Sequence, residues 1–237
     1  MDQAIRINKF FTGHGICSRR EADRLIESGA VTVNGLVAKL GDRVGPSDRI
    51  TCNGRVIPWG NAPVYLKYNK PVGVTTTSES HVARNIIAEI GYPERIFPIG
   101  RLDKESSGLI LLTNDGDIVN DILRAEFGHE REYVVDVDRP FDQLFMDQMS
   151  GGVMILGSPT RPCRMIRMGP ERFRIVLTEG RNRQIRRMCA TLGYRVLRLH
   201  RVRIMHITVA DLRPGEWKEL TEQERNQLWE AVGRAGA

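Results

Sequence analysis

A break in hydrophobic patterning divides this chain into two unequal parts. Before residue 58 the apolar residues recur first with the period of helices and then with the period of strands. Residues 59–63, Trp-Gly-Asn-Ala-Pro, form turns and carry no apolar periodicity, which is typical of a linker. The 237 residues also exceed the length of a typical single domain. We therefore expect a small domain over 1–58, a linker over 59–63 and a larger domain over 64–237.

The pattern of the small domain predicts two helices followed by a β-hairpin. An apolar and basic stretch from 5 to 11 ends near glycines, and Ser18, with Glu21 three residues later, predicts a capping box that begins a second helix. Alternating apolar residues then flank Asn34-Gly35, a strong signal for a two-residue turn. The basic residues of the helices lie opposite the positions that must pack. They predict one basic surface, made of Lys9, Arg19, Arg20 and Arg24.

The larger domain mixes strand-like runs with helical patterns. Strand-like runs cover 64–66, 72–74, 109–112, 133–137 and 173–177, and one amphipathic helix follows residue 222. The connections between them vary in length, which favours a mixed, mainly antiparallel sheet flanked by helices over a doubly wound parallel sheet. The predicted fold class is therefore α+β.

Positive charge is concentrated in one part of the chain. The formal net charge is +6, but the segment from Arg161 to Arg203 contains thirteen arginines, no lysine and two glutamates, a formal +11. Guanidinium groups suit bidentate phosphate contacts and stacking on bases, which lysine does not reproduce. We therefore expect a nucleic-acid partner, and the alternative is a solvated face or an acidic protein partner.

Several functional classes lack their usual sequence signals. The four cysteines are scattered and predict buried thiols, and neither they nor the histidines have the spacing of a metal site. No glycine-rich phosphate loop is present, so we expect neither a metal nor a cofactor. No apolar run approaches the ~20 residues that span a bilayer. We expect a cytoplasmic monomer without membrane contact.

Two resemblances sharpen this interpretation. The segment SRREADRLIESGAVTVNG resembles the core of the S-four type RNA-binding module, over residues 4–58. Three ordered motifs, GRLDKESSGL (100–109), HEREYVV (129–135) and EGRNRQIRRM (179–188), resemble those of the pseudouridine synthases of the RsuA/RluA superfamily. YNKPVGV (68–74) and GEW (215–217) also fit that family, so this resemblance spans about 64–220. Both together are similar to the RsuA branch.

The resemblance implies an isomerase that converts one uridine of structured ribosomal RNA into pseudouridine without a cofactor. Large-subunit (23S) RNA is the expected target, and tRNA or small-subunit RNA stays an alternative, as does a catalytically silent ribosome-assembly factor. The aspartate within RLD, Asp103, is the implied catalytic residue, and Tyr133 holds the position of the active-site tyrosine. Which uridine is modified does not follow from these residues.

Chemistry places a further demand on the site. Breaking the C–N glycosidic bond requires an ionised carboxylate, either as a nucleophile at C1′ or as a base that removes a sugar proton, and both roles stay open. A nearby cation favours the charged form of a carboxyl group. The resemblance implies Arg186 as the partner of Asp103, and Arg186 also lies beside the inward stripe of its predicted helix, with Arg187 as the fallback.

The substrate nucleotide must also leave its stack to reach a pocket. Flipping a nucleotide costs a few kcal/mol, and stacking of uracil on Tyr133 offsets about 1 to 3 kcal/mol of that cost. We expect Arg101 to fill the gap in the RNA or to contact the adjacent phosphate. The remaining RNA contacts are expected from the arginines of the basic segment, namely Arg181, Arg183, Arg187, Arg195, Arg198, Arg201 and Arg203.

Overall fold

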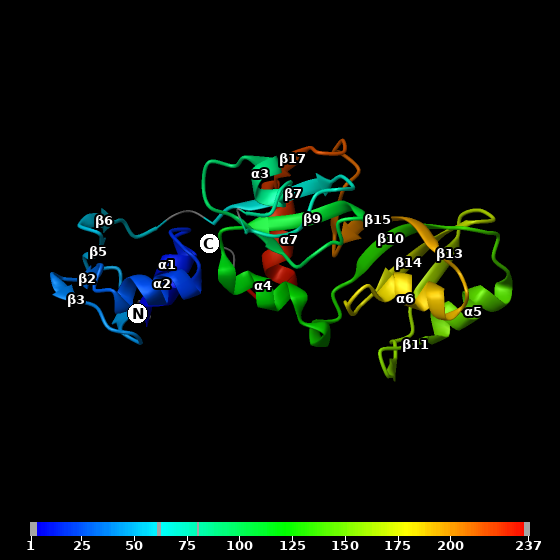
Figure 1. Ribbon diagram of the computed structural model, residues 1–237, viewed down its shortest axis with the longest axis horizontal. Coiled ribbons are helices and arrows are strands. Elements are labelled where there is room, and N and C mark those ends of the chain that lie inside the picture. The colour runs from blue at the N-terminus through cyan, green and yellow to red at the C-terminus, as the bar shows by residue number, and fades with distance from the viewer. Residues whose placement is uncertain (1–3, 61–62, 80, 235–237) are drawn as a thin grey trace. The chain divides into compact units, whose positions relative to one another are not determined.

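The computed structural model describes residues 4–60, 63–79 and 81–234 (Figure 1). The chain forms two compact units. Of the described residues, the smaller unit contains those up to Val64 together with 92–96 and 113–117, and the larger unit contains the others. Two short segments from beyond residue 64 thus join the smaller unit, which patterning along the chain did not predict. Asn61 and Ala62 of the expected linker lie outside the described residues, so the linker stays a prediction.

The smaller unit packs two helices against short strands. A four-stranded sheet has the order β3-β2-β5-β6, and β1 pairs with β4. Ile7, Phe10 and Phe11 are fully buried in its core beside Ala22 and Ile26 of the second helix. The elements of this unit are α1 (Ile7–Gly13), α2 (Arg19–Glu27), β1 (Ile5–Arg6), β2 (Val31–Val33), β3 (Leu36–Val37), β4 (Arg43–Val44), β5 (Ile50–Cys52) and β6 (Arg55–Ile57).

Local signals explain these elements, with two differences from expectation. The hairpin turns at Asn34 and Gly35, whose φ angles of 51° and 85° are those of a tight two-residue turn. The Ser18 side chain accepts a hydrogen bond from the Glu21 backbone, as predicted, but the Glu21 carboxylate pairs with Arg24 at 3.2 Å rather than completing a capping box. The first helix begins at Ile7 and not at Ile5, because residues 5 and 6 pair with β4.

The larger unit is built on a nine-stranded mixed sheet, which confirms the predicted α+β class. Its main path is β13-β14-β10-β15-β9-β7-β17, with β16 beside β15 and β8 beside β9 (Figure 1). β15 pairs with β9 in parallel, and the pairings of β10 with β14 and β15, of β13 with β14 and of β17 with β7 are antiparallel. The strands are β7 (Tyr65–Lys70), β8 (Phe97–Ile99), β9 (Ser107–Thr113), β10 (Arg131–Val137), β13 (Arg164–Arg167), β14 (Arg172–Leu177), β15 (Val196–Ile204), β16 (Ile207–Thr208) and β17 (Trp217–Glu219), with a separate hairpin of β11 (Met154–Ile155) and β12 (Ser158–Pro159).

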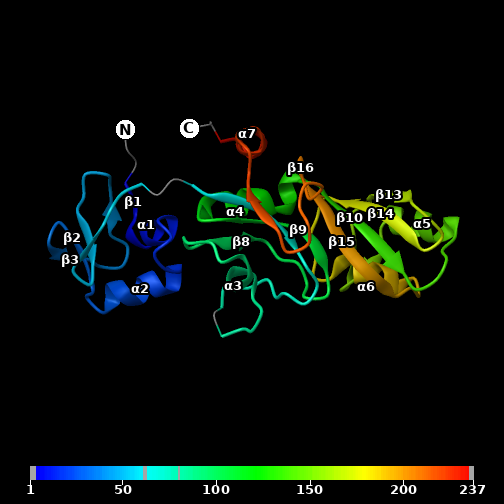
Figure 2. The ribbon, with the colours of Figure 1, turned by 90° about the horizontal axis from the view of Figure 1, so that it is seen from above.

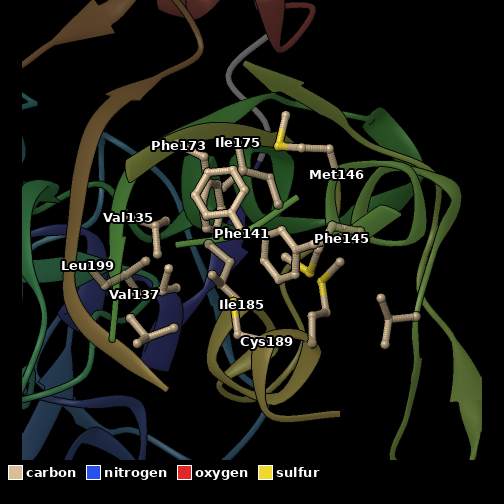
Figure 3. Close-up of a cluster of buried hydrophobic side chains, with 14 of the residues drawn as sticks. Val135, Val137, Phe141, Phe145, Met146, Phe173, Ile175, Ile185, Cys189 and Leu199 are labelled. Atoms are coloured by element: carbon tan, nitrogen blue, oxygen red, sulfur yellow. The ribbon is translucent and has the colours of Figure 1, made fainter. Parts of the chain in front are cut away.

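Helices cover this sheet and close two hydrophobic cores. Figure 2 shows α3 on one side of β8 and β9, and α4 and α7 on the other. One of these cores contains Phe141, Phe145 and Phe173, whose ring centroids lie 5.1 to 5.7 Å apart. Ile185 and Cys189 pack beside them (Figure 3). The helices are α3 (Ile86–Ile90), α4 (Gly116–Leu123), α5 (Gln143–Gly151), α6 (Gln184–Thr191) and α7 (Glu222–Ala231), and none of the described helices is long and apolar enough to cross a bilayer.

Several expectations for single segments need correction. Residues 72–74 form a turn with Gly73 at φ 93° and not a strand, because the strand before them ends at Lys70, the residue before Pro71. Cys189 is buried, whereas Cys17, Cys52 and Cys163 are only partly buried. Even this partial burial raises the pKa of the Cys163 thiol to about 11.

The parallel junction between β9 and β15 brings two backbones close together at a glycine. Gly108 pairs with Arg201 across it, and Gly108 has a φ angle of 107°. A β-carbon at this position would lie 2.2 Å from the backbone oxygen of Arg201 and 2.6 Å from its nitrogen. Only glycine therefore lets the two strands approach this closely.

We predict that Gly108→Ala lowers the free energy of unfolding by about 3 kcal/mol or more, because the methyl group overlaps backbone that cannot swing away and the φ angle is strained. Urea unfolding followed by circular dichroism measures the change. Gly151→Ala, at the end of α5 with no atom within 4 Å of the added carbon, is the matched control and should be nearly neutral. Equal stability of both variants would contradict the role given to this junction.

Candidate active site

A short loop fixed at several points carries Asp103. The loop connects β8 to β9, and Gly100 at φ 78° turns the chain into it. Thr76 donates a hydrogen bond from its hydroxyl to the Leu102 carbonyl at 2.7 Å. The Gly73 amide donates to the Lys104 carbonyl at 2.8 Å, so the residues on both sides of Asp103 are anchored. The turn at 72–74, which patterning predicted as a strand, therefore serves to hold this loop.

Two guanidinium groups face the Asp103 carboxylate. Arg183 Nη1 lies 3.5 Å from Asp103 Oδ2, and Arg186 Nε lies 3.9 Å from the same oxygen. The Asp103 side chain is 34% exposed, so the cavity side of the carboxylate stays accessible. Arg183 also pairs with Glu105 at 3.2 Å. The expected cationic neighbour at 186 is thus present, and a second one at 183 was expected only to bind RNA.

Arg186 is held rigidly in this position. Its Nη1 donates to the Val196 carbonyl at 3.2 Å, and its Nη2 donates to the Ser106 hydroxyl at 3.2 Å. Its Nε is buried and has no hydrogen-bond partner among the described residues. A buried donor without an acceptor costs free energy, so the nearby negative charge of Asp103 stabilises this N–H group. Arg187, the fallback, turns the other way and bonds to Asn182.

Tyr133 lies on β10, an interior strand of the sheet. Its cross-strand neighbours are Ile175 on β14 and Arg201 on β15, and the Arg201 guanidinium carbon lies 5.9 Å from the centre of its ring. Tyr133 and Asp103 both line one cavity of about 650 Å³, a size typical of ligand sites. The cavity wall therefore contains two of the residues that were predicted to be catalytic, Asp103 and Tyr133. Charged and polar side chains also line it, namely Arg101, Ser106, Arg131, Glu179, Arg181, Asn182, Arg183, Gln184 and Arg201.

The predicted RNA contacts differ in how much of each side chain is available. Arg101 is exposed and lines the cavity. Arg181 instead donates four hydrogen bonds to the β11–β12 hairpin, with distances of 2.6 to 3.1 Å, so a phosphate contact from it is not favoured. Lys9 lies on α1, where it is half-buried, whereas the three arginines of α2 are exposed, namely Arg19, Arg20 and Arg24.

The expectation that Arg201 binds phosphate at the surface is wrong. Its side chain is 4% exposed and lines the cavity. A β-bulge explains the error: Glu132 pairs with Arg203 and Tyr133 pairs with Arg201, so Val202 is an extra residue on β15. Arg203 pairs with Glu130 and Glu132, each at 2.7 to 2.8 Å, whereas Arg201 meets Tyr133. Simple alternation would have put both arginines on one face.

The sequence analysis also did not identify Lys70 and Arg131 as buried cations. Lys70 is completely buried and donates to the Pro71 and Val74 carbonyls at 2.9 Å each. Arg131 is 7% exposed and donates to the Ile122 carbonyl at 3.1 Å. Burial, reinforced by the charge of Arg201 and opposed by that of Asp103, lowers the pKa of Lys70 to about 8. Nothing in composition or period marks a lysine as buried, although Lys70 does stand between a strand and a proline.

The pKa of Lys70 predicts a dependence of stability on pH. The pKa of Lys70 in the folded protein, about 8, lies below the ordinary lysine value of 10.5, so the unfolded chain binds more protons between these pH values. The free-energy cost of burying the charged Lys70 is therefore relieved as pH rises. The stability of the protein relative to Lys70→Met should therefore rise by up to about 3 kcal/mol from pH 8 to 10.5. Urea unfolding at several pH values measures this difference. Lys67→Met is the control, because carboxylates raise the pKa of Lys67. The expectation would be contradicted if the stability of the protein relative to Lys70→Met did not change with pH.

Known proteins are similar to this chain in sequence and in fold. Residues 64–191 match the RNA pseudouridylate synthase family, and residues 5–50 match the S4 domain. The dual-specificity RNA pseudouridine synthase RluF of Escherichia coli is 48% identical over 98% of this chain and 80% of its own length. Ribosomal large subunit pseudouridine synthase B of Bacillus subtilis is 33% identical over 94% of this chain and 95% of its own length.

A solved structure agrees with these sequence matches. The crystal structure of a pseudouridylate synthase superimposes with a TM-score of 0.70 and 27% identity, over 94% of this chain and 99% of that one. Among the described residues no group of three or more His, Cys, Asp or Glu side chains gathers as metal ligands. With its S4 domain followed by a matching catalytic fold, the chain belongs to the RNA pseudouridylate synthase family.

Proposed function

We propose that this protein isomerises a uridine of large-subunit (23S) ribosomal RNA to pseudouridine, with Asp103 as the catalytic residue. The observation that carries the proposal is the cavity in which Asp103 and Tyr133 lie together, with two guanidinium groups within 4.0 Å of the carboxylate. The target is supported by the relatives, one named for the ribosomal large subunit and one named as dual-specificity. Transfer RNA or small-subunit RNA is the alternative target.

The reaction needs an anion and a place for a free base. The bond between C1′ and N1 breaks with its electron pair going to uracil, the base rotates, and an electron pair of the uracil anion then forms the bond from C5 to C1′. The C5 proton leaves and N1 takes up a proton, so the product is an isomer of uridine. Asp103 either attacks C1′ or removes a sugar proton, and both require its ionised form. Arg183 and Arg186 stabilise that form. The accessible third of the Asp103 side chain is where the ribose approaches.

Tyr133 and the arginines at the rim account for substrate binding. The flipped uracil stacks on the Tyr133 ring, which contributes about 1 to 3 kcal/mol toward the few kcal/mol that flipping costs. Arg101 contacts the RNA beside the vacated position. The exposed arginines of α2 add phosphate contacts that are independent of sequence, so binding weakens as salt rises.

A binding protein without catalysis is the second candidate. It would use the same S4 domain and the same basic surface. It has no need for a carboxylate flanked by two cations inside a cavity beside an aromatic ring. The geometry of Asp103 therefore favours the enzyme.

We predict that Asp103→Asn abolishes pseudouridine formation while RNA binding persists, because the amide keeps the shape of the side chain but neither attacks C1′ nor accepts a sugar proton. Release of tritium from C5-labelled uridine in ribosomal RNA measures turnover. Mapping pseudouridine in ribosomal and transfer RNA from cells with the protein, without it and with the variant identifies the target. Full tritium release by the variant would refute the catalytic role, and rescue of ribosome assembly without any pseudouridine would favour the binder.

Adjacent arginines give a matched test of the positioning role. Arg186→Gln should lower kcat roughly 100-fold or more with little change in RNA affinity, because it removes a buried cation that faces Asp103. Arg187→Gln should mainly weaken RNA binding and leave kcat nearly unchanged, because the Arg187 guanidinium bonds to Asn182. Single-turnover rates at saturating enzyme separate the two effects. Similar losses of kcat in both variants would contradict the assignment of Arg186.

A further inference from the structure

We propose that Arg201, assisted by Arg131, stabilises the uracil anion that leaves C1′ by donating hydrogen bonds to its carbonyl oxygens. This inference rests on the proposed function and deepens it, since it assigns a catalytic residue for the leaving base. Asp103 acts on the sugar side of the glycosidic bond. The cations at 131 and 201 act on the base side.

Both guanidinium groups lie in the wall of the cavity that contains Asp103 and Tyr133. Arg201 is 4% exposed and Arg131 is 7% exposed. They approach from neighbouring strands, Arg201 as the cross-strand partner of Tyr133 and Arg131 two residues before Tyr133 on β10. A base stacked on the Tyr133 ring therefore lies in the cavity whose wall holds both cations.

One hydrogen bond ties Arg201 to the neighbouring strand, and its Nη2 group is left without an acceptor. Its Nε donates to the Leu109 carbonyl at 2.6 Å, which ties the side chain to the strand that follows the Asp103 loop. Its Nη2 is buried and has no acceptor among the described residues. A buried donor without an acceptor is costly, so such groups in a cavity wall point to a ligand that supplies one.

The charges of these arginines are also not balanced by the protein. Within the described residues, no carboxylate lies within 4.0 Å of the guanidinium of Arg131 or Arg201. Glu179, which also lines the cavity, instead accepts hydrogen bonds from Gln184 and from the Arg161 backbone. The charge of Arg201 disfavours protonation of nearby Lys70. This region therefore favours an added negative charge.

The sheet departs from regular pairing to bring Arg201 into the cavity. The bulge at Val202 turns Arg201 toward Tyr133 while Arg203 stays with its glutamates on the other face. Bulges beside active sites redirect individual side chains in this way. Burying an arginine costs more free energy than burying an apolar side chain that fills the same space, so packing alone does not explain the bulge.

Chemistry explains why a cation is required there. When the C1′–N1 bond breaks, its electron pair stays on uracil, and the negative charge spreads from N1 to O2 and O4. Fixed donors directed at atoms where charge develops lower the barrier, because they need no reorganisation during the reaction. When the electron pair of the anion forms the bond from C5 to C1′, the charge on the base disappears, and the later loss of the C5 proton is balanced by a proton taken up at N1. The cation thus assists the intermediate and not the product.

The test compares two leaving groups under single-turnover conditions. RNA carrying 5-fluorouridine at the target position has a base that holds negative charge more easily, because fluorine withdraws electrons. The measured quantity is the rate at which intact nucleoside disappears, by mass spectrometry of digested RNA, for 5-fluorouridine and for uridine. The ratio of these rates should rise about tenfold or more in Arg201→Gln and in Arg131→Gln, because loss of the cation penalises the poorer leaving group more.

Controls separate electrostatic assistance from structural damage. Arg201→Lys keeps a cation and should keep a ratio near that of the unaltered protein, even if its rates fall. Arg203→Gln, two residues further along β15 on the other face, should leave the ratio unchanged. If Arg201→Gln does not fold, Arg131→Gln and Arg201→Lys still provide the comparison. A ratio that stays constant in the glutamine variants while both rates fall would overturn the inference. Absence of any pseudouridine formation by the unaltered protein would instead overturn the proposed function.

Discussion

The parallel contact between β9 and β15 is the constraint on which the rest of the larger unit depends. Gly108 allows the two backbones to meet, and Arg201 Nε bonds across the junction to the Leu109 carbonyl. The Asp103 loop leads directly into β9, and α6, which carries Arg186, leads into β15. Tyr133 joins through the pairing of β10 with β15. One junction thus brings together residues that lie as much as 98 positions apart in the chain, from Asp103 to Arg201.

Charge is distributed unevenly around this junction. Asp103 lies near Arg183 and Arg186, and Lys70, Arg131 and Arg201 are buried in the same unit. Burying so many cations opposes folding, because each loses hydration that backbone carbonyls only partly replace. The hydrogen bonds of Lys70 and Arg131 go to carbonyl oxygens of turns and helix ends, which keeps these cations in place without neutralising them. A site that processes a base with transient negative charge gains from such an arrangement, whereas a purely structural core does not.

Sequence predicted the parts of this architecture that depend on local patterns. The strands from 109 to 112, 133 to 137 and 173 to 177, the helix with Ile185 and Met188, and the loop position of Asp103 all appear in the structure. The face of the sheet on which Arg201 lies was not predictable, because a single extra residue on β15 reverses the face that strand alternation assigns. Lys70 escaped for a related reason: all six residues of β7 are buried, so its polar members do not mark a solvent face. Arg183 has a left-handed φ of 50° before α6, which no pattern in that segment announces.

Rotation of the base places an unusual demand on the residues that bind it. Uracil must turn so that C5 replaces N1 opposite C1′, and a half-turn about the axis through N3 and C6 exchanges O2 with O4 as well. A donor that binds O2 before the turn therefore meets O4 after it, at nearly the same place. An aromatic ring binds uracil equally well before and after the rotation, because stacking does not depend on which edge of the base faces the sugar. Tyr133 and the guanidinium of Arg201 are thus suited to hold the base through the turn, whereas donors or acceptors matched to its full edge would bind one orientation and oppose the other.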